Sequence, residues 1–233
     1  MSSNSDQLAE KIKTMDKDEA VEIILSILST SKNVELKIKA ADFLTQYDEI
    51  GNDNFQNIKI VFIKDHHPQL RLKLIDILTI YYQDDGINFL KEQYKNCKDG
   101  SVRTKLIEIV GELKLNKSIP FLIDALNDSN IETKKKAIVL LGKTESNEAL
   151  RPLLNIFHFR NTEIYNSLID TIVKIGNKGN LQIINDFINT EDLYIKREIP
   201  LILGKIKKKE SENVLLNLLK DNNMQYYFSS KGY

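Results

Sequence analysis

The sequence predicts an all-α protein in which helix pairs repeat along the chain and stack into an α-solenoid. Three observations support this fold class. Apolar residues recur at the three- and four-residue spacing of a helix face, and a glycine position returns about every 31 residues. The chain of 233 residues has only 9 Gly and 4 Pro. So few turn residues argue against a β-sandwich or a barrel, whose many short strands need turns.

The repeat is clearest at Gly111, Gly142 and Gly204, each of which follows two apolar residues. Gly142 lies 31 positions after Gly111, and Gly204 lies twice that interval after Gly142. Steps of 31 to 34 residues place the equivalent position of the other units at Thr45, Thr79 and Val173. The chain therefore contains six units in register and the beginning of a seventh.

Each unit predicts two helices, which we name A and B. Helix A carries apolar residues at i, i+3 and i+7, and its first apolar column is Val21, Phe55, Ile87, Ile119, Leu150 and Leu181. Capping boxes are predicted where Asp16 and Asp53 precede these helices. Helix B, of about 14 residues, follows a column that is Asn or Asp in five of six units, the residues that cap helices well. That column is Asn33, His67, Asp99, Asn130, Asn161 and Asp192.

These units define the expected domain organisation. We expect a polar segment or short helix over residues 1–15 and a single solenoid over 16–233. The repeats are predicted at 16–49, 50–83, 84–115, 116–146, 147–177 and 178–209, with a partial repeat at 210–233. The apolar stripe of helix B is too broad for one helix pair to bury, so stacking is required. Pro200 falls inside helix B of the sixth unit and predicts a kink or a late start.

The columns together resemble a known repeat. The shared order is a capping Asn or Asp, then an apolar residue followed by Arg or Lys, and then an apolar run that ends in Leu-Gly or a close variant. This order resembles the HEAT repeat, especially the short HEAT-like form found in bilin lyases of phycobilisomes. Asp99-Gly100-Ser101-Val102-Arg103 through Gly111 and Asn130 through Gly142-Lys143 carry the resemblance, which extends over about residues 16–220. It implies a right-handed solenoid with the B helices along its concave face and a role in holding other macromolecules. It also implies that one basic column bonds neighbouring repeats and is mainly structural: Lys37, Arg71, Arg103, Lys134 and Lys196.

No catalytic, metal-binding or cofactor-binding residues are predicted. Gly142-Lys143-Thr144 is similar to the end of a phosphate-binding loop, but Ala137 stands where such a loop needs its first glycine. The three histidines lack the i, i+4 spacing of a helical metal pair. Cys97 is the one cysteine and is predicted to be a packing or surface residue. We therefore expect a protein that is not an enzyme and has no cofactor.

Three surfaces are candidates for binding a partner. The first is a charged face of the B helices formed by Lys39, Asp42, Lys73, Asp76, Lys105, Glu108 and Lys136. Opposite charges three residues apart on this face also suit a merely solvated helix. The second is a basic patch formed by Lys196, Arg197, Lys205, Lys207, Lys208 and Lys209. The third is a docking end formed by Tyr226, Tyr227, Phe228 and Tyr233, for which a frayed last helix is the alternative.

The expected function is a non-catalytic scaffold or adaptor that binds another protein in the cytoplasm. No apolar run approaches the length of a membrane span, and the first ten residues lack an apolar signal core. One alternative, drawn from the resemblance alone, is an accessory subunit of an enzyme such as a bilin-lyase-like complex. The other is a nucleic-acid-binding HEAT-like protein, against which the balance of 33 basic and 33 acidic residues argues. The sequence leaves the partner and the oligomeric state open.

Overall fold

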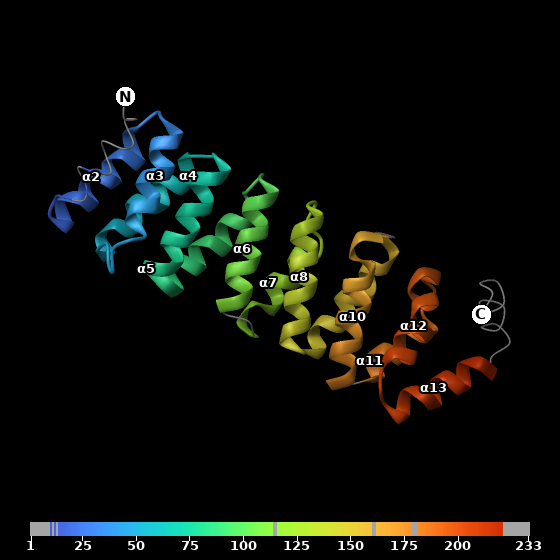
Figure 1. Ribbon diagram of the computed structural model, residues 1–233. Coiled ribbons are helices and arrows are strands. Elements are labelled where there is room, and N and C mark those ends of the chain that lie inside the picture. The colour runs from blue at the N-terminus through green and yellow to red at the C-terminus, as the bar shows by residue number, and fades with distance from the viewer. Residues whose placement is uncertain are drawn as a thin grey trace. The chain divides into compact units, whose positions relative to one another are not determined.

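The structure is a computed structural model that describes residues 10, 12, 14–113, 116–159, 162–178 and 181–220. These residues form helices and turns, and no strand occurs among them. The α-helices are α2 (Lys17–Thr30), α3 (Val34–Leu44), α4 (Phe55–Lys64), α5 (Pro68–Tyr94), α6 (Gly100–Leu113), α7 (Ile119–Ala125), α8 (Ile131–Thr144), α9 (Leu150–Asn155), α10 (Thr162–Lys178), α11 (Leu181–Asp186), α12 (Leu193–Lys205) and α13 (Lys209–Lys220) (Figure 1). Short 3-10 turns are η1 (Asn52–Asn54), η2 (Asn116–Ser118), η3 (Asn147–Ala149), η4 (Ile156–Phe159) and η5 (Phe187–Asn189).

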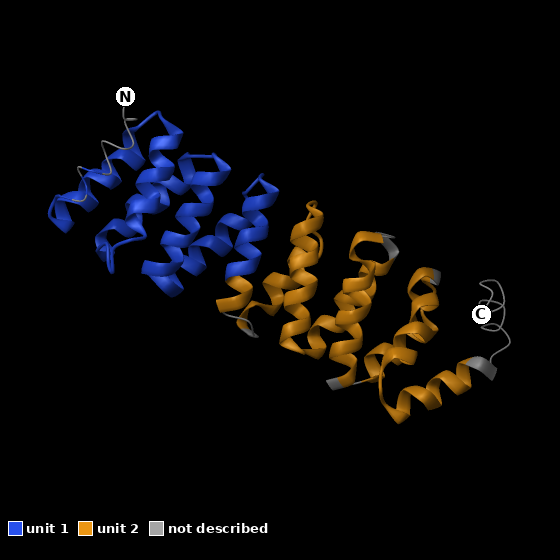
Figure 2. Cartoon of the chain, viewed as in Figure 1, with its two compact units in different colours: residues 1–109 blue, residues 110–233 orange. Residues whose placement is uncertain are grey.

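The chain divides into two compact units, residues 1–109 and 110–233, with the boundary inside α6 (Figure 2). In the first unit α2 packs on α3, α4 packs on α5, and the next contacts join α3 to α5 and α2 to α4. In the second unit α7 packs on α8 and α9 on α10, while α8 contacts α10 and α9 contacts α11. Each unit is therefore a stack of helix pairs in which A helices lie beside A helices and B helices beside B helices, as in an α-solenoid.

Side-chain caps place the starts of the B helices where the Asn/Asp column predicts them. The Asn33 side chain accepts a hydrogen bond from the Leu36 N–H at 3.1 Å, and Asn130 accepts one from the Thr133 N–H at 3.0 Å. Asp192 caps α12 in the same way. Asn161 lies outside the described residues. Local chemistry alone is enough to set these boundaries, because a cap satisfies N–H groups within its own helix.

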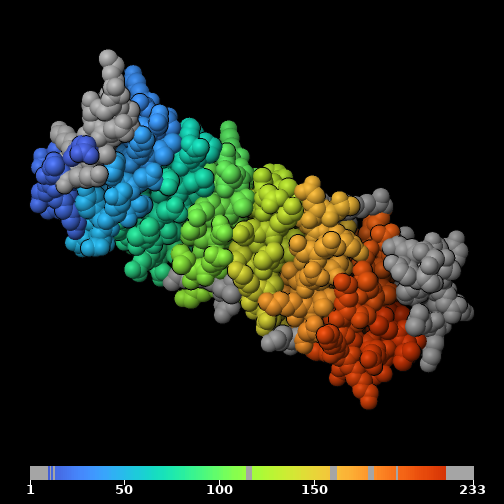
Figure 3. All heavy atoms as spheres, viewed as in Figure 1, coloured from blue at the N-terminus to red at the C-terminus, as the bar shows by residue number. Residues whose placement is uncertain are grey.

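The A helices bury the apolar columns against the B helices. Val21, Ile24 and Leu28 are all buried on α2, as are the equivalent Leu150 and Leu153 on α9. The buried side chains fill the space between consecutive helices within each unit. Figure 3 shows the outer face of the same residues in the view of Figure 1. The glycine column permits this packing, since a Cβ added to Gly111 would lie 2.6 Å from Leu140 Cδ1.

The expected helix cap at Asp53 was wrong, and so was the late start that was one of two expectations for Pro200. Asp53 does not cap a helix, because it lies within the 3-10 turn η1, and α4 begins later, at Phe55, with no side-chain cap bond. Pro200 does not delay α12, which begins directly after Asp192 and continues through the proline to Lys205. Pro200 is buried, and the missing N–H leaves the Lys196 carbonyl without its usual helical donor.

A break inside α5 falls at the last residue predicted for the second repeat, 50–83. Gln83 has φ 37° and ψ −114°, so the helix B of one pair turns there into the helix A of the next. Beside this break, a Cβ on Gly86 would lie 2.0 Å from the Leu78 carbonyl oxygen. Only glycine allows the two backbones to approach so closely, and this contact sets how the third pair stacks on the second.

Candidate protein-binding surface

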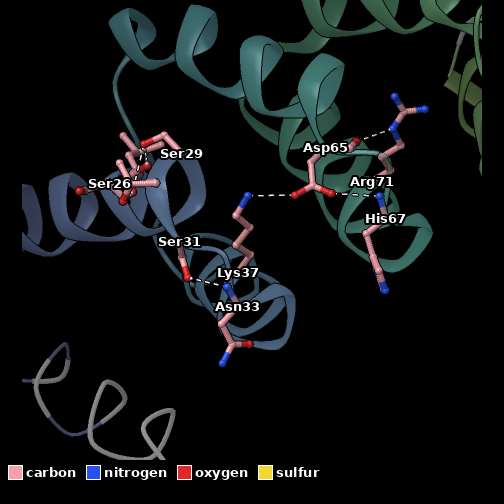
Figure 4. A network of polar contacts seen from close by, with 10 residues as sticks. Ser26, Ser29, Ser31, Asn33, Lys37, Asp65, His67 and Arg71 are labelled. Carbon is pink, nitrogen blue, oxygen red and sulfur yellow. Dashed lines mark hydrogen bonds and ion pairs between the residues drawn. The ribbon is translucent and has the colours of Figure 1, made fainter.

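A polar network joins the first two helix pairs at Asp65, the residue that follows α4 (Figure 4). Its carboxylate accepts a hydrogen bond from Lys37 Nζ on α3 at 2.9 Å and one from the His67 N–H at 3.0 Å. The Lys37 and Asp65 side chains are only 13% and 16% exposed. Burial alone would raise the pKa of Asp65, but the hydrogen bonds from the His67 N–H and Lys37, with their charges, outweigh it and hold this pKa below its ordinary value.

Arg71 extends the network into the third pair. Its guanidinium is buried, lies 5.0 Å from the centre of the Phe62 ring, and donates from Nε to the Asp65 carbonyl at 2.8 Å. One terminal nitrogen lies 2.9 Å from His66 Nδ1 and the other 3.5 Å from Cys97 Sγ. The neighbouring basic residue Arg103 donates to the Cys97 and Lys98 carbonyls, both at 2.9 Å.

These bonds confirm that Lys37 and Arg71 bond the following repeat, as the resemblance implies, whereas the Arg103 bonds to Cys97 and Lys98 lie within its own repeat. Cys97 is buried next to Arg71, so of the two predicted roles, packing and surface, it has the packing role. Lys134 and Lys196, at the same position of later repeats, are half-buried. The basic column therefore belongs largely to the framework, and the partner-binding surface has to be sought elsewhere.

The charged face of the B helices is brought together by the stacking. Lys73 Nζ on α5 lies 2.6 Å from Asp42 Oδ1 on α3, and Lys105 Nζ on α6 lies 3.5 Å from Asp76 Oδ1 on α5. Both pairs link consecutive B helices. The hydrogen bond to Asp42 raises the pKa of Lys73, burial opposes this, and the charges of Asp42 and Asp76 add to the rise.

The rest of this face in the first unit follows the same scheme. Lys39 lies 4.0 Å from Glu35 within α3. The side chains of Asp42 and Lys73 are 45% and 41% exposed, so the face is an array of paired charges in contact with solvent. Glu108 in the first unit and Lys136 in the second also take part in polar or electrostatic interactions. Such an array adds little stability, because each exposed pair contributes about 0.2–1 kcal/mol.

In the second unit, apolar side chains take the place of the acids on α8 and α12, whereas Asp170 keeps the acid on α10. Three positions before the glycine column, where the first unit has Asp42 and Asp76, stand Val139 on α8 and Leu201 on α12. They are 46% and 43% exposed. The sequence analysis did not select these residues, although the register that identified the acids could have found them.

Charges surround these apolar positions. Lys135 Nζ on α8 lies 2.8 Å from Glu132 and 3.6 Å from Glu163 on α10. On α12 the Arg197 side chain bonds to its neighbour Glu198 at 3.2 Å, and Glu198 also accepts from the Tyr165 hydroxyl on α10. Each exposed apolar side chain thus lies about one helical turn from charged groups, and protein-binding surfaces combine apolar contacts with polar ones in this way.

The basic residues of the second candidate surface do not form one patch, and the third surface lies outside the described residues. Lys196 and Arg197 lie near the start of α12, whereas Lys205, Lys207, Lys208 and Lys209 lie at its end and in the turn to α13. Eight helical residues separate Arg197 from Lys205, about 12 Å, so the basic residues form two groups. The aromatic docking end at Tyr226, Tyr227, Phe228 and Tyr233 lies outside the described residues.

Clusters that could hold a metal ion and helices that could span a membrane are absent from the part of the chain that the structure describes. In that part, no three His, Cys, Asp or Glu residues are grouped so that they could hold a metal ion. No described helix combines the length and the apolar character needed to cross a bilayer.

Comparison with known proteins identifies the middle of the chain. Residues 87–164, from the last turns of α5 to the start of α10, match the family model described as HEAT repeats. This segment consists of HEAT repeats. The HEAT repeats include Lys105 and Glu108 of the charged face and the exposed Val139.

The wider comparisons add little to this. No curated protein sequence matches the chain. Among solved structures, the crystal structure of the Escherichia coli protein YibA is similar to 95% of this chain and 82% of its own, with 19% sequence identity and a TM-score of 0.48.

Proposed function

We propose that this chain is a non-catalytic scaffold that binds a protein partner through the exposed face of its B helices. In this proposal the HEAT repeats extend beyond residues 87–164 and form one solenoid over 16–233. The support for this extension is the stacking of helix pairs and the side-chain caps at Asn33 and Asp192, which lie outside the matched segment. HEAT repeats typically mediate protein binding, and they do so without chemistry of their own.

The observation that carries the proposal is the exposure of Val139 and Leu201 at a position that is acidic in the first unit. A stable solenoid does not need apolar side chains there, because Asp42 occupies this position in the first unit and pairs with Lys73 of the next B helix. Burial of both side chains by a partner would contribute about 25 cal/mol per Å² of apolar surface removed from water. The surrounding ion pairs would then select the partner more than they strengthen its binding.

The same surface serves the enzyme-associated alternative. An accessory subunit holds its enzyme as a protein partner, so the two hypotheses differ in the partner and not in the site. We place the protein in the cytoplasm, because Cys97 forms no disulfide and a reducing compartment keeps cysteine in the thiol state.

Comparative affinity purification from the native host tests the proposal. The wild-type chain is used as bait beside a Val139→Glu/Leu201→Glu variant and a control, Leu216→Glu, which changes a side chain that is 55% exposed on α13. A protein partner should be recovered in stoichiometric amount with the wild type and the control and lost from the double variant. Recovery of the same proteins with all three baits would contradict the proposed surface.

A further inference from the structure

A hollow of about 740 Å³ lies between α2 and α4, two A helices of the first unit, away from the B-helix face. Its floor is apolar and includes Val21, Leu25 and Ile60, the last of which is 46% exposed. A second hollow of about 300 Å³ continues along the same helices and shares Ser29 and Ile60 with the first.

An ion pair bridges the equivalent seam in the second unit. Arg151 on α9 donates to Asp186 on α11 at 2.6 Å, and its guanidinium lies 5.7 Å from the centre of the Phe187 ring. Arg151 follows the first apolar column of its helix by one residue, and Asp186 follows that column by five. An arginine side chain thus spans from one A helix to the next and pairs with the acid on the far side.

The repeat register shows what occupies these places in the first unit. Glu22 stands where the second unit has Arg151, and Ile60 stands where it has Asp186. Neither can form the bridging pair, so the seam between α2 and α4 stays open. Among the described residues, the side chain of Glu22 forms no hydrogen bond or ion pair.

The charges around the first hollow are mostly acidic. Asp18, Glu22 and Glu49 line it against one cation, Lys17, which lies 3.1 Å from Glu49. Asp18 and Glu22 therefore remain as a net negative rim beside the exposed Ile60. A ligand that fits must bring positive charge to this rim and apolar surface to the floor.

We propose that the seam between α2 and α4 binds an extended protein segment that alternates basic and apolar side chains. An arginine of that segment would take the place that Arg151 holds in the second unit, with its guanidinium on Glu22 and its stem on Ile60. The first hollow alone extends from Lys17 to Ser29, about 18 Å of helix, so the second hollow, which Lys37 and Lys64 line beside Asp65, is not needed to hold the segment. This length accommodates about five or six residues of extended chain. The site is separate from the B-helix face and does not depend on the function proposed above.

The test uses a fluorescein-labelled peptide of eight residues that alternates leucine and arginine, and a second peptide with glutamate in place of arginine. Binding to the full chain is followed by fluorescence anisotropy at about 0.15 M salt, where long-range attraction is screened beyond ~8 Å. The variants are Glu22→Lys and a matched control, Glu92→Lys, which reverses an exposed charge on α5 outside both hollows. Circular dichroism confirms that each variant is folded.

The arginine peptide should bind the wild type and the control within a factor of two of each other, and Glu22→Lys should weaken binding at least tenfold. In a spectrum of the chain labelled at the isoleucine Cδ1 methyl groups, the signal assigned by Ile60→Val should shift on titration. Equal binding of the two peptides, equal binding by Glu22→Lys and wild type, or an unmoved Ile60 signal would each overturn the proposal.

Discussion

The ion pair between Lys37 and Asp65 is expected to stabilise the first unit through its charge. Asp65→Asn is the sharpest perturbation, because asparagine keeps an oxygen that accepts the His67 N–H and removes only the negative charge. Lys37, whose side chain is 13% exposed, is then left with an ammonium group that has lost its partner. The substitution therefore measures the pair and not the turn that follows α4.

The magnitude follows from the geometry. At the Nζ–Oδ2 distance of 2.9 Å, the Coulomb attraction is roughly 6 kcal/mol with an effective dielectric constant of about 20. Desolvation of two largely buried charges cancels most of this, so Asp65→Asn should lower the free energy of unfolding by about 2 kcal/mol at pH 7.

The effect should depend on pH in one direction. The pKa of Asp65 is lowered in the folded chain, so its stabilising charge is present above the pKa of the unfolded chain, about 3.9. The contribution is lost as the pH falls through the folded pKa. The difference between wild type and Asp65→Asn should therefore be constant from pH 7 to about pH 5 and shrink below about pH 4.

Urea denaturation followed by circular dichroism at several pH values measures this difference. A double-mutant cycle with Lys37→Met isolates the pair, and its coupling energy should be about 1.5–2 kcal/mol at pH 7. A difference that does not change with pH, or a coupling energy below about 0.5 kcal/mol, would refute the argument.

Three further predictions concern packing and the exposed charges. Gly86→Ala should lower the free energy of unfolding by about 3 kcal/mol, because its Cβ would meet a backbone oxygen. Gly204→Ala should raise the free energy of unfolding by about 0.5–1 kcal/mol, because its Cβ would meet nothing closer than Leu215 at 3.9 Å. Urea denaturation of both variants measures the two changes, and equal effects would contradict the prediction. The buried thiol of Cys97 should react with Ellman's reagent only when urea unfolds the chain, and rapid reaction in native buffer would show that the Arg71 contact is wrong. The exposed pair of Asp42 and Lys73 should show a coupling energy below about 1 kcal/mol in a double-mutant cycle, and a larger value would mean that the charged face is part of the framework.

Much of the architecture was predictable because it depends on local chemistry. A capping oxygen and the apolar spacing that follows act within one helix, and so Asn33, Asn130 and Asp192 marked their helices correctly. Asp53 shows the limit of such signals. Its segment forms the 3-10 turn η1 after Gly51, whose φ of 78° turns the chain, and no capping pattern encodes that choice.

The register of the repeats predicted more than the individual motifs did. It placed Lys37, Arg71 and Arg103 in one structural column before any contact was known. The same register contained Val139 and Leu201, but it could not show that their side chains are exposed. That distinction from core residues came from the structure. The break at Gln83 falls at the register's boundary between the second and third repeats, but its backbone angles depend on how one pair stacks on the next.

The sequence by itself determined the helices, their order and the repeat, since these follow from spacing and capping along a single chain. The tertiary structure decided which charges meet: Asp42 with Lys73, Asp76 with Lys105, and Arg151 with Asp186. It also decided which seam stays open between α2 and α4. The physical reason is that ion pairs and hollows depend on distances of a few ångströms between neighbouring helices, and packing sets those distances where periodicity does not.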